Sequence, residues 1–267
     1  MVIFRRLTIV IFLLCGIPAF GNEKPPQEFA AMRSALCDQA ADFTETGCRV
    51  CPQFMAKGSE GRLELRGTLE INSVLLGSFT SVGRTEALLS SGSCFSHADG
   101  FASAFLLRKE QGSWRRLSFF HMAGPMGNCW KIPGQDATRD FVVCNEADYG
   151  QGAISVMGFD VSGKVKTNSE LVQTWTNPIR TLEKQKHCSS LSADIKKVSF
   201  NSVEVPIFLN SFDVDPPINC FDEAEGTNSK ISNSKKVEGV AVFVRANDSF
   251  APDEGTRKLL SEVEKSR

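Results

Sequence analysis

Two cysteines separated by two residues form the sharpest reactive motif in the sequence, Cys48-Arg49-Val50-Cys51. Such a pair is redox-active where a helix N-terminus or a cation lowers the pKa of the first thiol, and Arg49 supplies a positive charge. A thioredoxin-type site also needs a long helix after the pair, which Pro52 and the glycine-containing loop behind it do not predict. We favour structural disulfides, with a thiol-disulfide redox site as the alternative; a zinc site with Cys37 would lack a fourth ligand.

Five further residues that could bind a ligand lie in two polar segments that follow similar apolar stretches. The first segment holds His97 and Asp99, and the second holds Glu146, Asp148 and Tyr149. If the apolar stretches are equivalent strands of units that lie side by side, both segments lie on one rim, where binding residues gather. We take these five residues as the candidate binding site. The alternative is that both segments are ordinary turns, in which Asp and Gly serve the backbone geometry.

Enzyme signatures are weak. Serines are plentiful, but none stands in a Gly-x-Ser-x-Gly motif, and His97, His121 and His187 are the only histidines. No glycine-rich phosphate loop is present. Carboxylate pairs suited to glycoside hydrolysis can be drawn, as they can from any acidic β protein. We therefore predict no catalytic residue, metal or cofactor, and keep a secreted hydrolase as a lesser alternative.

Residues 1–21 are predicted to be an export signal. The Arg5-Arg6 pair precedes the apolar residues 7–15, and Ala19-Phe20-Gly21 is a small-x-small cleavage site. The mature chain would then begin at Asn22, in the periplasm or outside the cell. No later stretch is long and apolar enough to span a bilayer.

The charge balance argues against nucleic acid as a partner. The leader removes two of the 30 basic residues and none of the 31 acidic ones, so the mature chain has a small excess of negative charge. Nucleic-acid binding needs a basic field. An unknown protein or glycan is the expected ligand.

Eight cysteines remain after the predicted cleavage, and an even number in an exported chain indicates up to four disulfides. Cys129 and Cys144 flank the polar loop 133–138 at similar distances, so we predict that they face each other in a hairpin and are bonded. The other pairings stay open. The full set of candidates comprises Cys37, Cys48, Cys51, Cys94, Cys129, Cys144, Cys188 and Cys220.

The elements that must position these residues are predicted to be strands in a repeated unit. Residues 75–120 have the pattern of a four-strand meander, which returns in 128–171 and more weakly in 195–244. Glu86-Ala87-Leu88-Leu89 matches Asp140-Phe141-Val142-Val143, and the turn glycines Gly112 and Gly163 match as well. The offset of about fifty residues is near that of four-stranded β repeats.

Gly77-Ser78-Phe79 followed by Arg84-Thr85-Glu86-Ala87-Leu88-Leu89 resembles the repeat of FG-GAP/VCBS-type β-propellers, and Thr138-Arg139-Asp140-Phe141-Val142-Val143 carries half of the same pattern. The resemblance covers residues 71–248 and implies degenerate four-stranded antiparallel blades. The calcium loop of that family is replaced here by Thr80-Ser81-Val82-Gly83, so no calcium site is implied. Three units are fewer than a closed propeller needs, and we expect an incomplete propeller or sandwich-like packing.

The remaining segments frame this β domain, which we place at residues 63–250. Residues 22–62 are predicted to hold a helix over 27–41 and a cysteine-rich loop, and residues 63–72 alternate like a strand with one buried face. The polar insertion 222–236 is predicted to be mobile, and 251–267 to be a helical tail. We predict a mainly β, disulfide-stabilised exported protein with a non-enzymatic binding or structural role.

Overall fold

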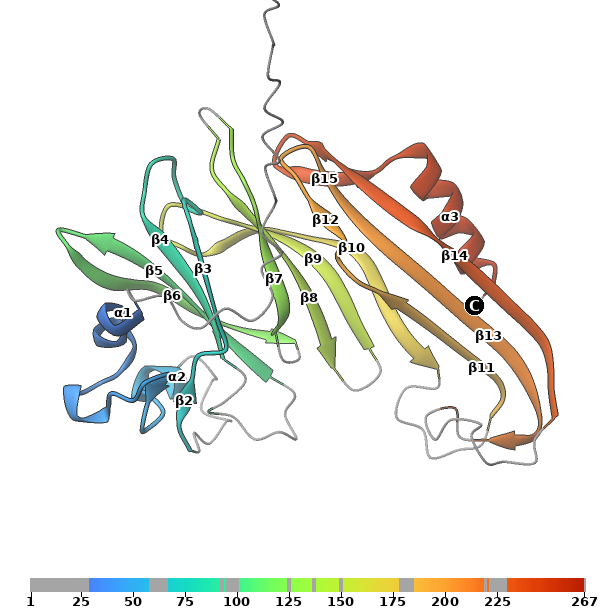
Figure 1. The fold of residues 1–267 in the computed structure, drawn as a ribbon, viewed down its shortest axis with the longest axis horizontal. Helices are drawn as coiled ribbons and strands as arrows, with labels where there is room; N and C mark the ends of the chain where they lie inside the picture. The colour runs from blue at the N-terminus through green and yellow to red at the C-terminus, as the bar shows by residue number, and fades with distance from the viewer. Residues whose placement is uncertain are drawn as a thin grey trace, which may run out of the picture.

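The computed structural model describes residues 29–57, 67–91, 94, 101–123, 126–135, 138–148, 151–177, 185–218, 220 and 230–266. Within these ranges the protein is mainly β, with antiparallel sheets, a short helix near each end and no closed barrel (Figure 1). The predicted fold class is therefore confirmed. The predicted export signal, residues 1–21, lies outside the described residues.

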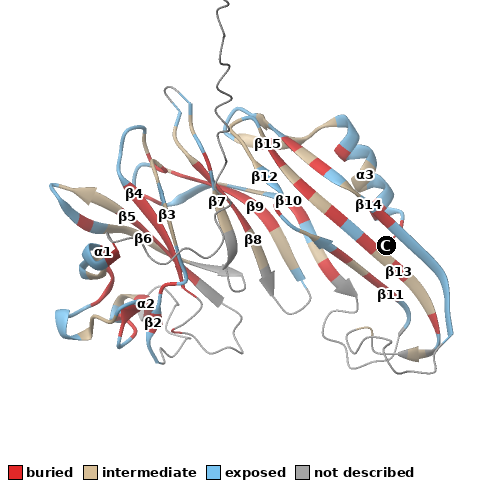
Figure 2. Cartoon of the chain, in the orientation of Figure 1, coloured by how far each residue is buried: buried red, intermediate tan, exposed pale blue. Residues whose placement is uncertain are grey.

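The first predicted unit is a four-stranded antiparallel meander in the order β3-β4-β5-β6. Its strands are β3 (Ser73–Gly77), β4 (Glu86–Ser91), β5 (Phe101–Glu110) and β6 (Ser113–Ala123). Gly112 turns the chain between β5 and β6 with a φ of 83°, as the sequence predicts. Every residue of β4 is buried, because both faces of this sheet are covered (Figure 2).

The second and third predicted units are joined in one larger sheet, because the end of β10 pairs with β11. Along this sheet the strands follow the order β15-β14-β13-β11-β10-β9-β8-β7, and β12 pairs with β13. The strands are β7 (Met126–Ile132), β8 (Phe141–Asp148), β9 (Gln151–Phe159), β10 (Val165–Asn177), β11 (Gln185–Ala193), β12 (Lys197–Val198), β13 (Ser202–Ile218), β14 (Lys230–Ala246) and β15 (Ser249–Pro252). The two units therefore do not stand apart as separate blades.

Part of the insertion predicted to be mobile is ordered strand. Residues 230–236 begin β14 and pair with β13, for example Ser232 with Asp213 and Lys236 with Asn210. The prediction was wrong here because backbone pairing with a neighbouring strand orders a polar segment that buries little side-chain surface. Residues 222–229 lie outside the described residues.

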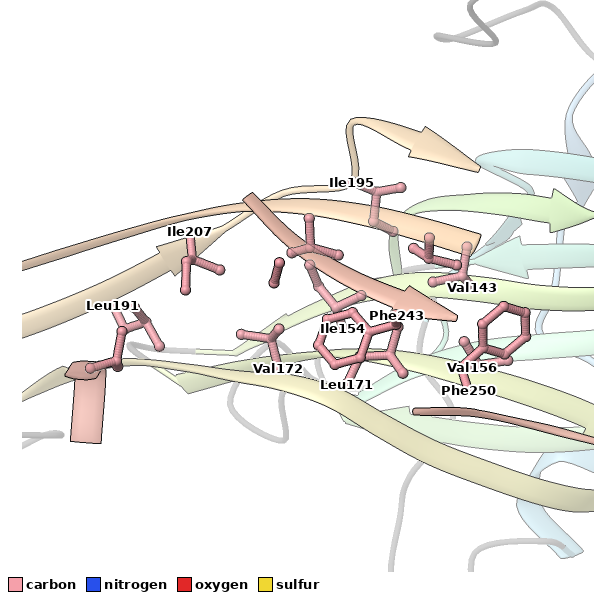
Figure 3. Close-up of a cluster of buried hydrophobic side chains, with 14 of the residues drawn as sticks. Val143, Ile154, Val156, Leu171, Val172, Leu191, Ile195, Ile207, Phe243 and Phe250 are labelled. Atoms are coloured by element: carbon pink, nitrogen blue, oxygen red, sulfur yellow. The ribbon is translucent and has the colours of Figure 1, made fainter. Parts of the chain in front are cut away.

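The nine-stranded sheet curls so that one of its faces packs on itself. Val143 and Ile154, from β8 and β9, lie in the same buried cluster as Phe243 and Phe250 from β14 and β15 (Figure 3). Arg245 of β14 adds a second link between these ends, since its guanidinium lies 4.9 Å from the centre of the Phe141 ring on β8. The main core thus fills the inside of a curved sheet.

A C-terminal helix, α3 (Glu254–Glu264), covers part of β14. Asp253 caps it by accepting the Thr256 N–H at 2.7 Å. The Thr256 hydroxyl accepts the Val242 N–H at 2.6 Å, one residue before Phe243, where the pairing of β14 with β15 begins. Val263 reaches the main core. The helical tail predicted from the sequence is confirmed.

The N-terminal segment covers the outer face of the four-stranded sheet (Figure 1). Its elements are α1 (Phe29–Leu36), the 3-10 helix η1 (Ala40–Asp42), β1 (Gly47–Cys48), α2 (Gln53–Lys57) and β2 (Leu69–Glu70). The helix α1 ends at Leu36, before the predicted end at residue 41, and Cys37 directly after it is bonded to Cys48. Residues 27 and 28 lie outside the described residues. Leu69 is buried and Glu70 exposed, as the alternation predicts, whereas residues 61–66 lie outside the described residues.

Two acidic residues at matching positions of the predicted repeat close equivalent loops. Glu86 accepts the backbone N–H of Thr80 at 2.8 Å, and Asp140 accepts that of Gly134 at 2.7 Å, each from six residues earlier in the chain. The second oxygen of Asp140 accepts the Ser78 N–H at 2.8 Å. Asp140 therefore ties the β3–β4 turn of one sheet to the β7–β8 turn of the other.

Replacing Asp140 by Ala is expected to lower the free energy of unfolding by about 2–4 kcal/mol, because two backbone N–H groups lose their acceptor. Urea unfolding should show a lower midpoint with an unchanged slope. Asp248→Ala, in the exposed β14–β15 turn, is the matched control and should change stability by less than about 0.5 kcal/mol. Equal effects of the two substitutions would contradict this role of Asp140.

Candidate functional site

Cys48 and Cys51 are bonded to different cysteines and not to each other. Cys37 pairs with Cys48 and Cys51 pairs with Cys94, with S–S distances of 2.06 and 2.12 Å. All four are buried. The motif therefore consists of two structural bonds that fasten the N-terminal segment, and the disulfide that a redox Cys-x-x-Cys site would use is not formed.

The other four cysteines form two further disulfides. Cys129 and Cys144 face each other across β7 and β8, with Cα atoms 4.1 Å apart, so the predicted pair is confirmed. Cys188 is bonded to Cys220. Four disulfides are typical of chains that fold in an oxidising compartment.

Only part of the predicted rim is described. Glu146 lies in β8, and Asp148 is the last residue of that strand, where its backbone pairs with Gln151 of β9. His97, Asp99 and Tyr149 lie outside the described residues. The rim stays a prediction.

Glu146 has the most perturbed carboxyl group in the described part of the chain. Its side chain is half-buried, and this burial raises its pKa from 4.5 to about 7, with a smaller contribution from the negative charge of Glu170. The two glutamates come from β8 and β10 and face residues on β9, Ala153 for Glu146 and Ser155 for Glu170. A carboxyl group with this pKa exchanges its proton near neutral pH.

Three polar side chains from β11, β13 and β14 form a hydrogen-bonded cluster. His187 Nδ1 lies 2.7 Å from one oxygen of Asp213, and the Asn233 amide donates to the other oxygen at 2.7 Å. Asn233 first, and His187 second, lower the pKa of Asp213. The carboxylate fixes the orientation of the imidazole. No described serine is hydrogen-bonded to that ring, so the cluster is not a complete nucleophilic site within the described residues.

Sequence analysis missed a shallow groove on the outer face of the large sheet. It has a volume of about 640 Å³ and crosses three neighbouring strands, β11, β13 and β14. Its lining comprises Ser192, Ala193, Asp194, Pro206, Ile207, Phe208, Glu238, Gly239 and Val240. The side chains of Phe208 and Val240 are 38% and 43% exposed, which is unusual for large apolar residues.

Strand alternation explains why apolar side chains line this groove. Ile207 and Leu209 of β13 point into the main core, so Phe208 between them must point to the other face. Pro206 lies on the same outer face, opposite Val240. The strand is tolerant of proline at this point because β11 has ended at Ala193 and its ladder is interrupted there.

A signal for the groove was present in the sequence. The run Val205-Pro206-Ile207-Phe208-Leu209 is apolar at every position, whereas a strand with one wet face should alternate with polar residues. Such a run indicates either two covered faces or an exposed apolar patch. Because no described element covers the outer face at Phe208, the second applies, and such patches mark interaction sites.

Neither a protein-family profile nor a curated protein sequence matches this chain. Within the described residues, no group of three or more potential metal ligands is found. No described helix has the length and apolar character needed to cross a bilayer.

The raised pKa of Glu146 predicts a pH-dependent stability. The folded state holds this proton more tightly than the unfolded state, so the stabilisation is complete below pH 4.5 and is lost as the pH rises through about 7. The free energy of unfolding should fall across this window in the wild type, and Glu146→Gln should lack that part of the fall. Urea unfolding at a series of pH values measures it.

Glu170→Gln is the matched control for this experiment, because it removes only the weaker of the two causes. It should reduce the pH dependence less than Glu146→Gln does. The same pH slope in the wild type and in Glu146→Gln would show that this carboxyl group titrates normally.

Proposed function

We propose that this protein is an exported, non-enzymatic binding protein of the cell envelope or the extracellular space, and that a partner protein docks in the groove on β11, β13 and β14. The observation that carries the proposal is the exposure of Phe208 and Val240 on the neighbouring strands β13 and β14, on an outer sheet face that no described element covers. Export is supported by the four disulfides.

The chemistry of the groove favours a protein over a glycan. Phe208, Pro206 and Val240 offer apolar contact surface, and the acidic residues Asp194 and Glu238 also line the groove, with Glu238 opposite Phe208. An exposed aromatic side chain is typical of a protein interface centre, where it contributes most of the affinity. A partner with an apolar anchor and a basic rim fits this surface best.

Internal repetition remains part of the proposal. The matching loop-closing bonds of Glu86 and Asp140, and the positive φ of both Gly112 and Gly163, support a shared ancestry of the first two units and the likeness to FG-GAP/VCBS-type repeats. The edge-to-edge joining of β10 and β11 gives a packing unlike that of separate propeller blades. The groove arises from that joined sheet.

Site-specific photo-crosslinking tests the docking proposal in the cells that make the protein. A benzoyl-phenylalanine in place of Phe208 should give one adduct of defined mass with a partner protein that mass spectrometry can identify. The same residue at Val50, which is exposed in the cysteine-rich segment, is the matched control and should not give that adduct. Adding Val240→Asp to the Phe208 probe should abolish it.

Affinity for the identified partner provides the second measurement. Phe208→Ala should weaken binding by about tenfold or more, as expected for an interface anchor. The urea midpoint of this variant is measured alongside, because Phe208 is only 38% exposed and its truncation also removes buried apolar surface. No protein adduct at position 208, or equal adducts at 208 and 50, would overturn the docking proposal. Specific binding of a glycan without any protein adduct would also overturn it.

A further inference from the structure

Two turns from different sheets are held together at the side of the molecule away from the groove. The guanidinium of Arg108 on β5 donates to the Thr80 hydroxyl in the β3–β4 turn and to the Val161 carbonyl in the β9–β10 turn, the latter at 3.3 Å. Its Nε donates to the fully buried Glu86 at 2.8 Å. The two turns therefore form one fixed surface.

Both turns present valine at their tips. Val82 is 50% exposed and Val161 is 74% exposed, the highest value among the large apolar residues of the described chain. Val161 is fixed in place: the Asp160 carboxylate accepts the Ser162 N–H at 2.8 Å, and Gly163 adopts a φ of 86°. A side chain that is 74% exposed at the tip of a turn gains little from packing, so packing alone does not account for a valine at this position.

Basic residues flank these valines. Arg84 follows Val82, and Lys164 and Lys166 follow Val161; all three are exposed. Asp160 is the one acidic residue in segments 80–85 and 160–166, and its carboxylate is occupied by the backbone of its own turn. Neither Arg84 nor Lys166 forms an ion pair with any described residue. The surface therefore has two exposed valines, and the charged residues around them have a net positive charge.

We infer that this paired-turn surface, Val82 and Val161 with Arg84, Lys164 and Lys166, docks on an anionic lipid bilayer. Valine tips enter the boundary between headgroups and acyl chains, and the cations behind them lie at the level of the anionic headgroups. The exposed tips do not line the groove on β11, β13 and β14, so they suit a soft, flat partner better than an apolar anchor of another protein. The inference is independent of the groove.

Two valines and three cations are a weak membrane anchor. The attachment is therefore reversible, since stable anchoring needs much more buried apolar surface. Such attachment would keep the protein at the membrane surface while the groove stays accessible. It should weaken as salt rises, because the ions screen exposed charges within a Debye length.

Vesicle co-sedimentation of the full mature chain tests the inference. Wild-type protein should bind vesicles of phosphatidylcholine with phosphatidylglycerol and not vesicles of phosphatidylcholine alone. Val161→Asp, and separately the pair Lys164→Glu and Lys166→Glu, should each lower the partition coefficient by about tenfold or more. Val240→Asp makes the same substitution at an exposed valine of the groove and is the matched control; this variant should bind the anionic vesicles as tightly as the wild type does.

Folding of each variant is checked by its urea midpoint, which should match the wild type because the substituted side chains are exposed. Val161→Ser provides a milder second variant, expected to bind less tightly than the wild type and more tightly than Val161→Asp. Equal binding to neutral and anionic vesicles, no binding to either, or unchanged binding of both charge and valine variants would overturn the inference. Capture of an acidic protein through these turns without vesicle binding would overturn it as well.

Discussion

The buried ion pair between Glu86 and Arg108 is the interaction on which the arrangement of the two sheets depends. Glu86 is wholly buried at the start of β4, and an unpaired charge there would be very costly. Its oxygens are satisfied by the Arg108 guanidinium and by the N–H and hydroxyl of Thr80. Because Arg108 also reaches the Val161 carbonyl, one network joins the four-stranded sheet to the β9–β10 turn of the large sheet. Replacing one partner of such a buried ion pair lowers the free energy of unfolding by about 3–5 kcal/mol.

The same architecture explains why the proposed binding surfaces lie where they do. The N-terminal segment, fastened by disulfides, covers one face of the four-stranded sheet and β7–β9 cover the other, so its inner strand β4 is buried along its whole length. The large sheet curls around its own core and leaves the outer face of β13 and β14 without a cover, where Phe208 is exposed. The turns joined by Arg108 lie where the two sheets meet. Groove and turns are thus consequences of how the sheets pack.

Features that depend on near neighbours in the sequence were predictable, and those that depend on distant pairing were not. Cys129 with Cys144, the turn at Gly112 and the helix after Asp253 follow from local spacing and backbone geometry, and all are confirmed. The Cys51–Cys94 bond and the β10–β11 pairing join segments whose contact no local pattern encodes. Of the candidate site, the sequence pointed to Glu146. The apolar run 205–209 was compatible with either two covered faces or an exposed patch, because the exposure of Phe208 depends on which face of the curved sheet stays uncovered.

Hydrogen exchange in Arg108→Lys tests most directly whether this one side chain joins the two turns. Lysine keeps the positive charge beside Glu86 but lacks a second nitrogen, whereas Arg108 reaches Thr80 and Val161 with Nη2 while its Nε binds Glu86. The account predicts that the backbone amides of Thr80 and Gly163 lose protection together, by about tenfold or more, while the Val242 amide held by Thr256 keeps its protection. If the Gly163 amide exchanges as in the wild type, or if only the β3–β4 turn loosens, Arg108 does not couple the sheets and the account is contradicted.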